Sequence, residues 1–218
     1  MDIYVGVNLL QYLKRVLLFY QHKYILEVKN NLIILLKKVY SQNDVIVHSG
    51  DFCEQGTIEE VEDFVEWFAA LPHKHKIFVA GNHDDCLYGA TIEGLPDGVY
   101  YLCHSGIEID GVRFYGLPMF VADELSGEYE KAISCIPSDT DVLITHQPPY
   151  GILDFTDGVH YGNISLLGRV LSIKPCLHLF GHVHKANGKV EAHDTLYVNG
   201  SIVSGMKIVY KPQRLVIN

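Results

Sequence analysis

The chain has 218 residues, of which 48% are hydrophobic and 20% charged, so it holds ample core material for one large domain. Its formal net charge is −9 and it has only four arginines, which argues against a long nucleic acid as partner because phosphate-backbone binding needs a Lys/Arg-rich surface. No apolar run approaches the roughly 20 residues of a membrane span, so we expect no membrane partner. The five cysteines lack Cys-x-x-Cys spacing, which favours reduced thiols in a cytoplasmic protein. We expect one domain over residues 1–218.

The first part of the chain, residues 1–40, differs in character from the rest. Between residues 9 and 24 apolar side chains recur at steps of three and four residues, which predicts an amphipathic helix. The positions are Leu10, Leu13, Leu17, Tyr20 and Tyr24. We therefore expect an atypical, helical N-terminal segment ahead of a motif-bearing core over residues 45–199.

The core shows alternating strand and helix patterns. Helices are predicted at residues 57–70, where Val61, Phe64 and Phe68 have helical spacing, and at residues 164–171. Asp110-Gly111 between two apolar runs is a strong hairpin signal. The predicted strands cover residues 45–48, 77–80, 107–109, 112–115, 142–144, 179–180, 196–198 and 207–210. This mixture predicts an α/β fold.

Four of the strands are followed by side chains that can bind a metal ion. The motifs are Gly50-Asp51, Gly81-Asn82-His83-Asp84, Thr145-His146 and Gly181-His182-Val183-His184. In open α/β sheets, ligands collect beyond the carboxyl ends of the strands, so we expect one shared site. Carboxylate and amide oxygens with imidazole nitrogens suit Mn, Fe or Zn. Each motif alone also occurs as ordinary turn or surface chemistry, and it is their recurrence in one chain that favours a metal centre.

The four motifs, in this order, resemble those of the calcineurin-like metallophosphoesterase family, and the similarity covers about residues 45–199. The run at residues 148–154 and the later Lys174-Pro175 resemble the small single-domain branch that includes the metallophosphoesterase-domain brain proteins and their bacterial relatives. The resemblance implies a four-layer α/β/β/α sandwich. It also implies an enzyme that hydrolyses a small phosphodiester, such as a cyclic nucleotide, by metal-activated water.

The resemblance assigns metal ligands residue by residue. Asp51 would bridge two metal ions. Asn82, His146 and His182 would complete the shell of one ion, whereas His184 would belong to the other. Because the metals supply the positive charge that a phosphate meets, an acidic chain is compatible with this chemistry.

The resemblance also implies two catalytic residues. His83 would face the leaving-group oxygen or the transferring phosphoryl group, and Asp84 would hold the His83 ring in orientation. Alternatively, Asp84 is an N-cap or Asx-turn residue of the loop. Residues that could reach the substrate, or be ordinary loop residues, are Tyr150, Asp154, His160, Tyr161 and Asn199.

One part of the family pattern is missing from this sequence. The family carries an Asp-x-His motif after its first strand, which supplies two ligands to the metal that His184 serves, and no such triplet precedes Val45. A helix in this region would displace the first strand. Two explanations remain open: a divergent N-terminus that packs on the sandwich, or a reading-frame or start-site error upstream of about residue 35. The abrupt start of the match at Val45 favours the error.

The gap predicts one metal ion, held by Asp51, Asn82, His146 and His182, and a weakened phosphoesterase. A catalytically impaired metal-binding protein that acts in interaction or regulation is the alternative function. A different metal hydrolase of the amidohydrolase type is disfavoured, because its His-x-His would lie near the start of an eightfold barrel pattern.

Overall fold

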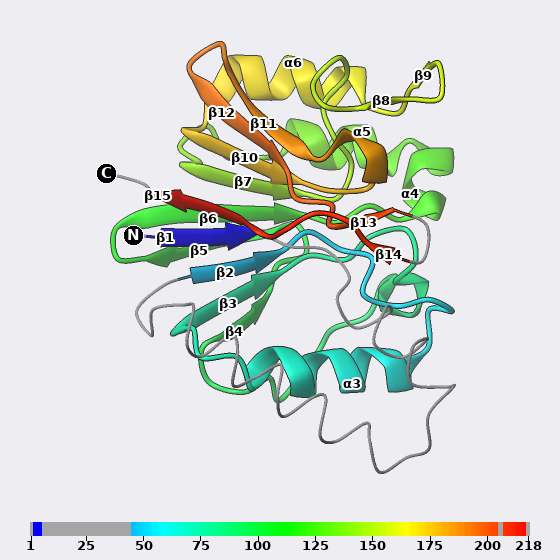
Figure 1. Ribbon diagram of the computed structural model, residues 1–218, viewed down its shortest axis with the longest axis vertical. Helices are drawn as coiled ribbons and strands as arrows, with labels where there is room; N and C mark the ends of the chain where they lie inside the picture. The colour runs from blue at the N-terminus through cyan, green and yellow to red at the C-terminus, as the bar shows by residue number, and fades with distance from the viewer. Residues whose placement is uncertain (1, 6–44, 205–206, 217–218) are drawn as a thin grey trace.

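The computed structural model describes residues 2–5, 45–204 and 207–216, and two large sheets lie at its centre (Figure 1). The first has five strands in the order β15-β1-β2-β3-β4, from Gln213–Val216, Asp2–Val5, Val45–His48, His75–Phe78 and Val99–Tyr101. The second has six strands in the order β11-β12-β10-β7-β6-β5, from Gly188–Ala192, Thr195–Asn199, Leu177–Phe180, Val142–Thr145, Val112–Leu117 and Ser105–Ile109. Neighbouring strands are parallel in both sheets except at β15, β11 and β5.

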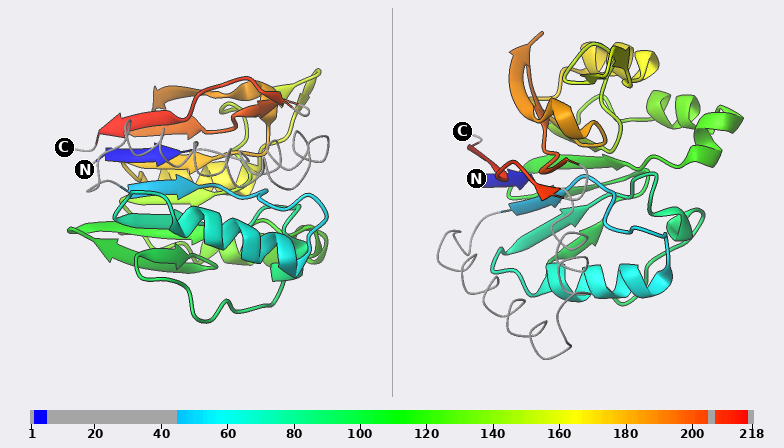
Figure 2. Two further views of the ribbon diagram at one scale, coloured as in Figure 1. Left: turned by 60° about the horizontal axis from the view of Figure 1, so that its bottom comes forward. Right: turned by 45° about the vertical axis from the view of Figure 1, so that its right-hand side comes forward.

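Helices cover the outer faces of both sheets, as Figures 1 and 2 show. Helix α3 (Ile58–Ala69) lies on the five-stranded sheet, and α5 (Glu128–Ser134) and α6 (Ile164–Ile173) lie on the six-stranded sheet. The connections contain α4 (Val121–Ser126), the 3-10 turns η1 (Asp85–Leu87) and η2 (His184–Ala186), and the strand pairs β8–β9 (Phe155–Thr156, Val159–His160) and β13–β14 (Val203–Ser204, Lys207–Ile208). The predicted α/β/β/α sandwich is confirmed.

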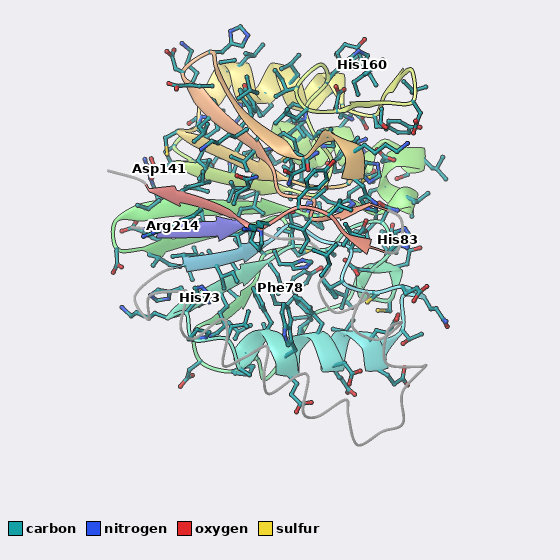
Figure 3. All side chains as sticks on the ribbon, in the orientation of Figure 1. His73, Phe78, His83, Asp141, His160 and Arg214 are labelled. Atoms are coloured by element: carbon teal, nitrogen blue, oxygen red, sulfur yellow. The ribbon has the colours of Figure 1, made fainter. Side chains whose placement is uncertain are left out.

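The core sits in three apolar layers because side chains alternate along each strand. Val45 and Val47 of β2 point into the layer between the sheets, where they join Ile144 and Leu179 of the second sheet. Phe78 of β3 faces the opposite way and packs between the five-stranded sheet and α3, where Figure 3 labels it. A third layer lies between the six-stranded sheet and helices α5 and α6. Both sheets are thus fixed in register by two-sided burial.

Helix α3 begins where the sequence predicts it, at a capping box. The Thr57 hydroxyl accepts the Glu60 N–H at 3.3 Å, and Glu60 accepts the Thr57 N–H at 3.4 Å. Glu60 also accepts the N–H groups of Glu54 at 3.1 Å and Gln55 at 2.9 Å. The helix cap therefore also holds the loop that follows Asp51.

The N-terminal strand corrects one expectation. Asp2–Val5 forms β1 and pairs in parallel with β2, so the sheet's first strand is not displaced. The predicted helix at residues 9–24 lies outside the described residues. Asp110 and Gly111 have φ angles of 51° and 81° and close the predicted β5–β6 hairpin. The last predicted strand, residues 207–210, is shorter in the structure and covers Lys207–Ile208.

None of the helices in the described part of the chain has the length and apolar character needed to cross a membrane.

Candidate metal centre

The four motifs lie together at one end of the sandwich. Because β2, β3, β7 and β10 all point the same way, the loops after them meet at the edge toward which their arrowheads point in Figure 1. Figure 3 places His83 at this end of the molecule. Asp51 and Asn82 come from the five-stranded sheet, and His146 and His182 come from the six-stranded sheet. The site is therefore assembled across the two sheets.

Four candidate ligand atoms converge on one point. His146 Nε2 lies 3.3 Å from Asp51 Oδ2 and 3.0 Å from Asn82 Oδ1. His182 Nδ1 lies 3.0 Å from Asn82 Oδ1 and 3.2 Å from His146 Nε2. Among the described residues, Asp51, His146 and His182 form the only group of three or more acidic, histidine or cysteine side chains close enough to share an ion. This convergence is what the sequence motifs predicted, and occupation by a metal remains a prediction.

His146 is oriented as a metal ligand would be. Its Nδ1 lies 2.7 Å from the Ser49 carbonyl oxygen, which can only accept, so Nδ1 carries the proton and Nε2 faces the centre. Burial disfavours the charged ring, but the Asp51 carboxylate outweighs burial and raises the pKa of His146. A divalent ion among the same atoms would compete with that proton. The Ser49 carbonyl left no signal in the sequence.

His182 and Asp51 are held in the forms that bind metals. Burial, followed by the proximity of His146, lowers the pKa of His182 to about 4, so its ring is neutral near pH 7. Burial opposes ionisation of Asp51, but His146 outweighs it and holds the pKa of that carboxyl well below its usual range. One anionic oxygen, one amide oxygen and two imidazole nitrogens form a mixed set suited to Mn, Fe or Zn.

Two glycines allow the loops to approach this closely. A Cβ on Gly50 would lie 2.6 Å from the Gly81 nitrogen, and a Cβ on Gly81 would lie 2.4 Å from Asp51 Oδ1. Asp51 and His182 have φ angles of 61° and 64°, in the left-handed region that side chains rarely adopt. Strained backbone of this kind persists where the surrounding structure enforces it, commonly at functional sites.

Asp84 has a task in the backbone that the sequence did not predict. Its carboxylate accepts three backbone N–H groups, from Gly81 at 2.7 Å, Asp51 at 2.8 Å and Cys53 at 2.8 Å. None of its hydrogen bonds goes to the His83 ring, and its side chain does not cap η1. Asp84 does stand at the N-cap position of η1, as one expectation had it, but without a side-chain cap hydrogen bond. Its role in orienting the His83 ring stays a prediction. The carboxylate is fully buried and ties the Asp51 loop to the Asn82 loop.

His83 lies on the surface beside the centre. Its backbone N–H donates to Asp51 Oδ1 at 3.1 Å, and its ring is exposed. The main chain of His83 thus fixes the Asp51 carboxylate, while the ring is free to meet a ligand. The catalytic role of that ring remains a prediction.

A family assignment follows once these positions are known. The family model described as calcineurin-like phosphoesterase matches residues 18–186. The chain belongs to the calcineurin-like phosphoesterase family. Its matched region contains all four motifs of the metal centre.

Curated relatives of this family member support the assignment. A UPF0046 protein of Caenorhabditis elegans is 37% identical over 72% of the chain and 62% of its own length. The human metallophosphoesterase domain-containing protein 1 is 33% identical over 78% of the chain and 62% of its own length. The chain therefore spans about six tenths of the length of these relatives.

Solved structures share the fold at low sequence identity. The TT1561 protein of Thermus thermophilus has a TM-score of 0.54 and 13% identity, with 91% of this chain and 88% of that chain covered. GAP50, titled the anchor in the inner membrane complex of Plasmodium, has a TM-score of 0.52 and 14% identity, with 99% of this chain and 77% of that chain covered. These likenesses concern the sandwich alone.

His184 lies apart from the four converging residues. It opens η2, is partly buried and does not belong to the Asp51, His146 and His182 group. It lines a cavity of about 310 Å³ beside the centre, whose walls are Thr156, Asp157, Tyr161, His182, Val183, His184 and Lys185. The structure thus brings four of the five predicted ligands together and leaves His184 on the cavity wall.

The substrate-loop residues divide into two groups. Tyr161 lines the cavity, and Tyr150 packs against His160 with ring centroids 4.9 Å apart. Asp154 and Asn199 are buried and structural: Asp154 accepts from the backbone of Gly151 and Gly162 and from His160, and Asn199 donates to the Leu153 and Val183 carbonyls. Lys185 and Asp157 in the cavity wall were not predicted, because neither belongs to a motif.

Proposed function

We propose that this chain is a metal-dependent phosphoesterase that hydrolyses a small phosphodiester at the Asp51, Asn82, His146 and His182 centre. The observation that carries the proposal is the convergence of four ligand atoms from four loops, because those of Asp51, Asn82 and His182 lie 3.3, 3.0 and 3.2 Å from His146 Nε2. The 310 Å³ cavity beside them supports a small substrate. The five cysteines, all in the described part of the chain, form no disulfide, which is compatible with a reducing, cytoplasmic compartment.

The residues divide the chemistry among themselves. Asp51, Asn82, His146 and His182 would hold a divalent ion such as manganese, which supplies Lewis acidity and lowers the pKa of a water molecule. The water oxygen forms a new bond to phosphorus as the P–O bond to the leaving group breaks, and the water gives up its proton to solvent, from which His83 is later reprotonated. The exposed His83 imidazole gives a proton to the departing oxygen. The Asp84 carboxylate accepts backbone N–H groups from both loops and so keeps Asp51 beside Asn82.

We further propose that one ion is held tightly per chain. Two-metal catalysis needs cations about 3.5–4 Å apart with full ligand shells. Of the motif residues that the structure describes, only Asp51 and His184 would serve the second ion, since the sequence lacks the Asp-x-His triplet that serves it in the family. We therefore expect phosphodiester turnover to be slower than in family members that hold two metal ions.

The test combines turnover with metal content. With added manganese, the purified chain should cleave a bis-aryl phosphodiester, and His146→Ala should lower the rate by more than about 100-fold by removing a ligand. His193→Asn is the matched control and should keep the rate, because His193 lies in the exposed turn before β12, at the sheet edge opposite to the loop after β10. After dialysis, elemental analysis should find one ion per wild-type chain and none in His146→Ala.

The missing triplet also favours a second candidate, a metal-binding member of the fold that no longer turns over substrate. One bound ion without diester cleavage in any divalent metal would select it. Two tightly held ions would refute the single-metal part of the proposal, and a chain that binds none would end the phosphoesterase proposal.

A further inference from the structure

One ion pair lies in the wall of the cavity beside the metal centre. Lys185 Nζ donates to both carboxylate oxygens of Asp157, at 2.8 and 2.9 Å. Lys185 directly follows His184, and both line the cavity with His182. Among the described residues of this wall, Lys185 is the only lysine or arginine.

Asp157 is presented by a tight hairpin. It occupies the tip between β8 and β9, where Asp157 and Gly158 have φ angles of 52° and 84°, the pattern of a two-residue turn with both central residues left-handed. The turn holds the Asp157 carboxylate over the cavity without burying it: the two side chains are 60% and 66% exposed for Lys185 and Asp157. An exposed ion pair of this kind contributes little stability and is opened at small cost.

The charge balance of the chain makes this lysine significant. The protein carries 26 acidic and 17 basic residues, so an anionic ester approaches a surface that repels it overall. A phosphoester oxygen that reaches the cavity meets Lys185, the one Lys or Arg of the cavity wall. That cation is held by the Asp157 carboxylate, whose anionic oxygens accept charge-assisted hydrogen bonds as phosphate oxygens do.

We propose that Lys185 is the anion-binding residue of this cavity, and that Asp157 is an internal counter-ion that a phosphoester oxygen displaces. The Lys185 ammonium leaves Asp157 and donates to a non-bridging phosphoryl oxygen next to the metal centre. This inference rests on the proposed function, because it assumes a phosphoester as ligand. It predicts that loss of the Lys185 charge weakens phosphate binding and that loss of the Asp157 charge strengthens it.

The experiment measures the affinity of the manganese-loaded full chain for inorganic phosphate by calorimetry. Lys185→Gln should weaken phosphate binding about tenfold, the effect of losing a hydrogen bond to a charged group. Asp157→Asn should tighten it about two- to fivefold, because the competing pair is removed. Lys189→Gln, an exposed lysine of β11 that does not line the cavity, should leave the affinity unchanged. Melting curves check that each variant is folded.

The directions in which phosphate affinity changes in Lys185→Gln and Asp157→Asn distinguish a binding role of the ion pair from a structural one. If the pair only braces the hairpin, both variants act in the same direction or neither acts, and the inference is overturned. Diester turnover that depends on His146, with no response of phosphate affinity to Lys185→Gln, overturns the inference and leaves the proposed function standing. Absence of both turnover and phosphate binding in the loaded wild type overturns both.

Discussion

His178 is a histidine that the metal centre does not use. The Thr145 hydroxyl donates its one proton to the Gln147 carbonyl at 2.6 Å, so the contact of 3.0 Å between Thr145 and His178 Nε2 must be donated by the ring. The buried Nδ1 is left bare and without a partner. Burial accordingly lowers the pKa of His178 to about 3.

This residue should make the protein acid-sensitive. Since the folded pKa lies below the unfolded value of about 6.5, the stability contributed by neutral His178 is complete above pH 6.5 and falls as pH drops toward 3. Between pH 7 and pH 5 the free energy of unfolding should fall by about 2 kcal/mol less in His178→Gln than in the wild type. Urea titrations of the chelator-treated protein measure this. An unchanged pH dependence in the variant would contradict the assignment, and exposed His104→Gln is the control.

Asp84 shows how one buried carboxylate can organise a site without entering it. Burial, followed by the charge of Asp51, raises the pKa of Asp84 to about 7, while the backbone N–H groups of Gly81 and Cys53 oppose that rise. The three N–H donors fix the loops that present Asp51 and Asn82. We expect the role of Asp84 to be visible in metal affinity.

Asp84→Asn should weaken manganese binding about 10- to 100-fold, as loss of an outer-shell partner does in other metal sites. The amide nitrogen of Asn must face at least one backbone N–H, so the variant should also lose about 1–3 kcal/mol of stability. His83→Ala should leave manganese affinity intact and lower turnover. If Asp84 instead acted through the His83 ring, the two variants would share a turnover defect with normal metal affinity.

At the level of the element, the loops after the strands contain the candidate metal ligands, and the capping box of α3 fixes one of these loops by hydrogen bonds. The capping box of α3 fixes the segment after Asp51 through Glu60, and the two glycines let that segment meet the Asn82 loop. Helix α6, in contrast, contains Gly168 at an exposed position, where an added Cβ would meet no atom within 4 Å outside the helix's own backbone. The same substitution should therefore have opposite effects at the two places.

Gly81→Ala should destabilise the protein and abolish tight manganese binding, because the new methyl group would lie 2.4 Å from Asp51 Oδ1 and 2.7 Å from the Asp51 backbone nitrogen. Gly168→Ala should stabilise it by about 0.5–1 kcal/mol, since alanine loses less backbone entropy in a helix interior. Thermal melts and metal titrations of the two variants test the pair. If Gly81→Ala and Gly168→Ala changed stability and manganese affinity equally, the close approach of the Asp51 and Asn82 loops would not be needed for metal binding.

At the level of the whole molecule, the resemblance to a known family implied the sandwich, and the sequence itself predicted the convergence of Asp51, Asn82, His146 and His182. It could do so because each residue follows a short apolar strand, and parallel strands end at a common edge. It could not predict the backbone hydrogen bonds of Asp84 or the carbonyl partner of His146, since these depend on loop conformation. Nor did periodicity reveal β1, because Asp2–Val5 is short and precedes a helical pattern.

The four converging residues come in pairs from different sheets, with Asp51 and Asn82 on one side and His146 and His182 on the other. A cation there would be a crosslink between the two halves of the hydrophobic core. Ion affinity and global unfolding would then be thermodynamically linked, so a displacement of one sheet relative to the other would lower the affinity for the ion.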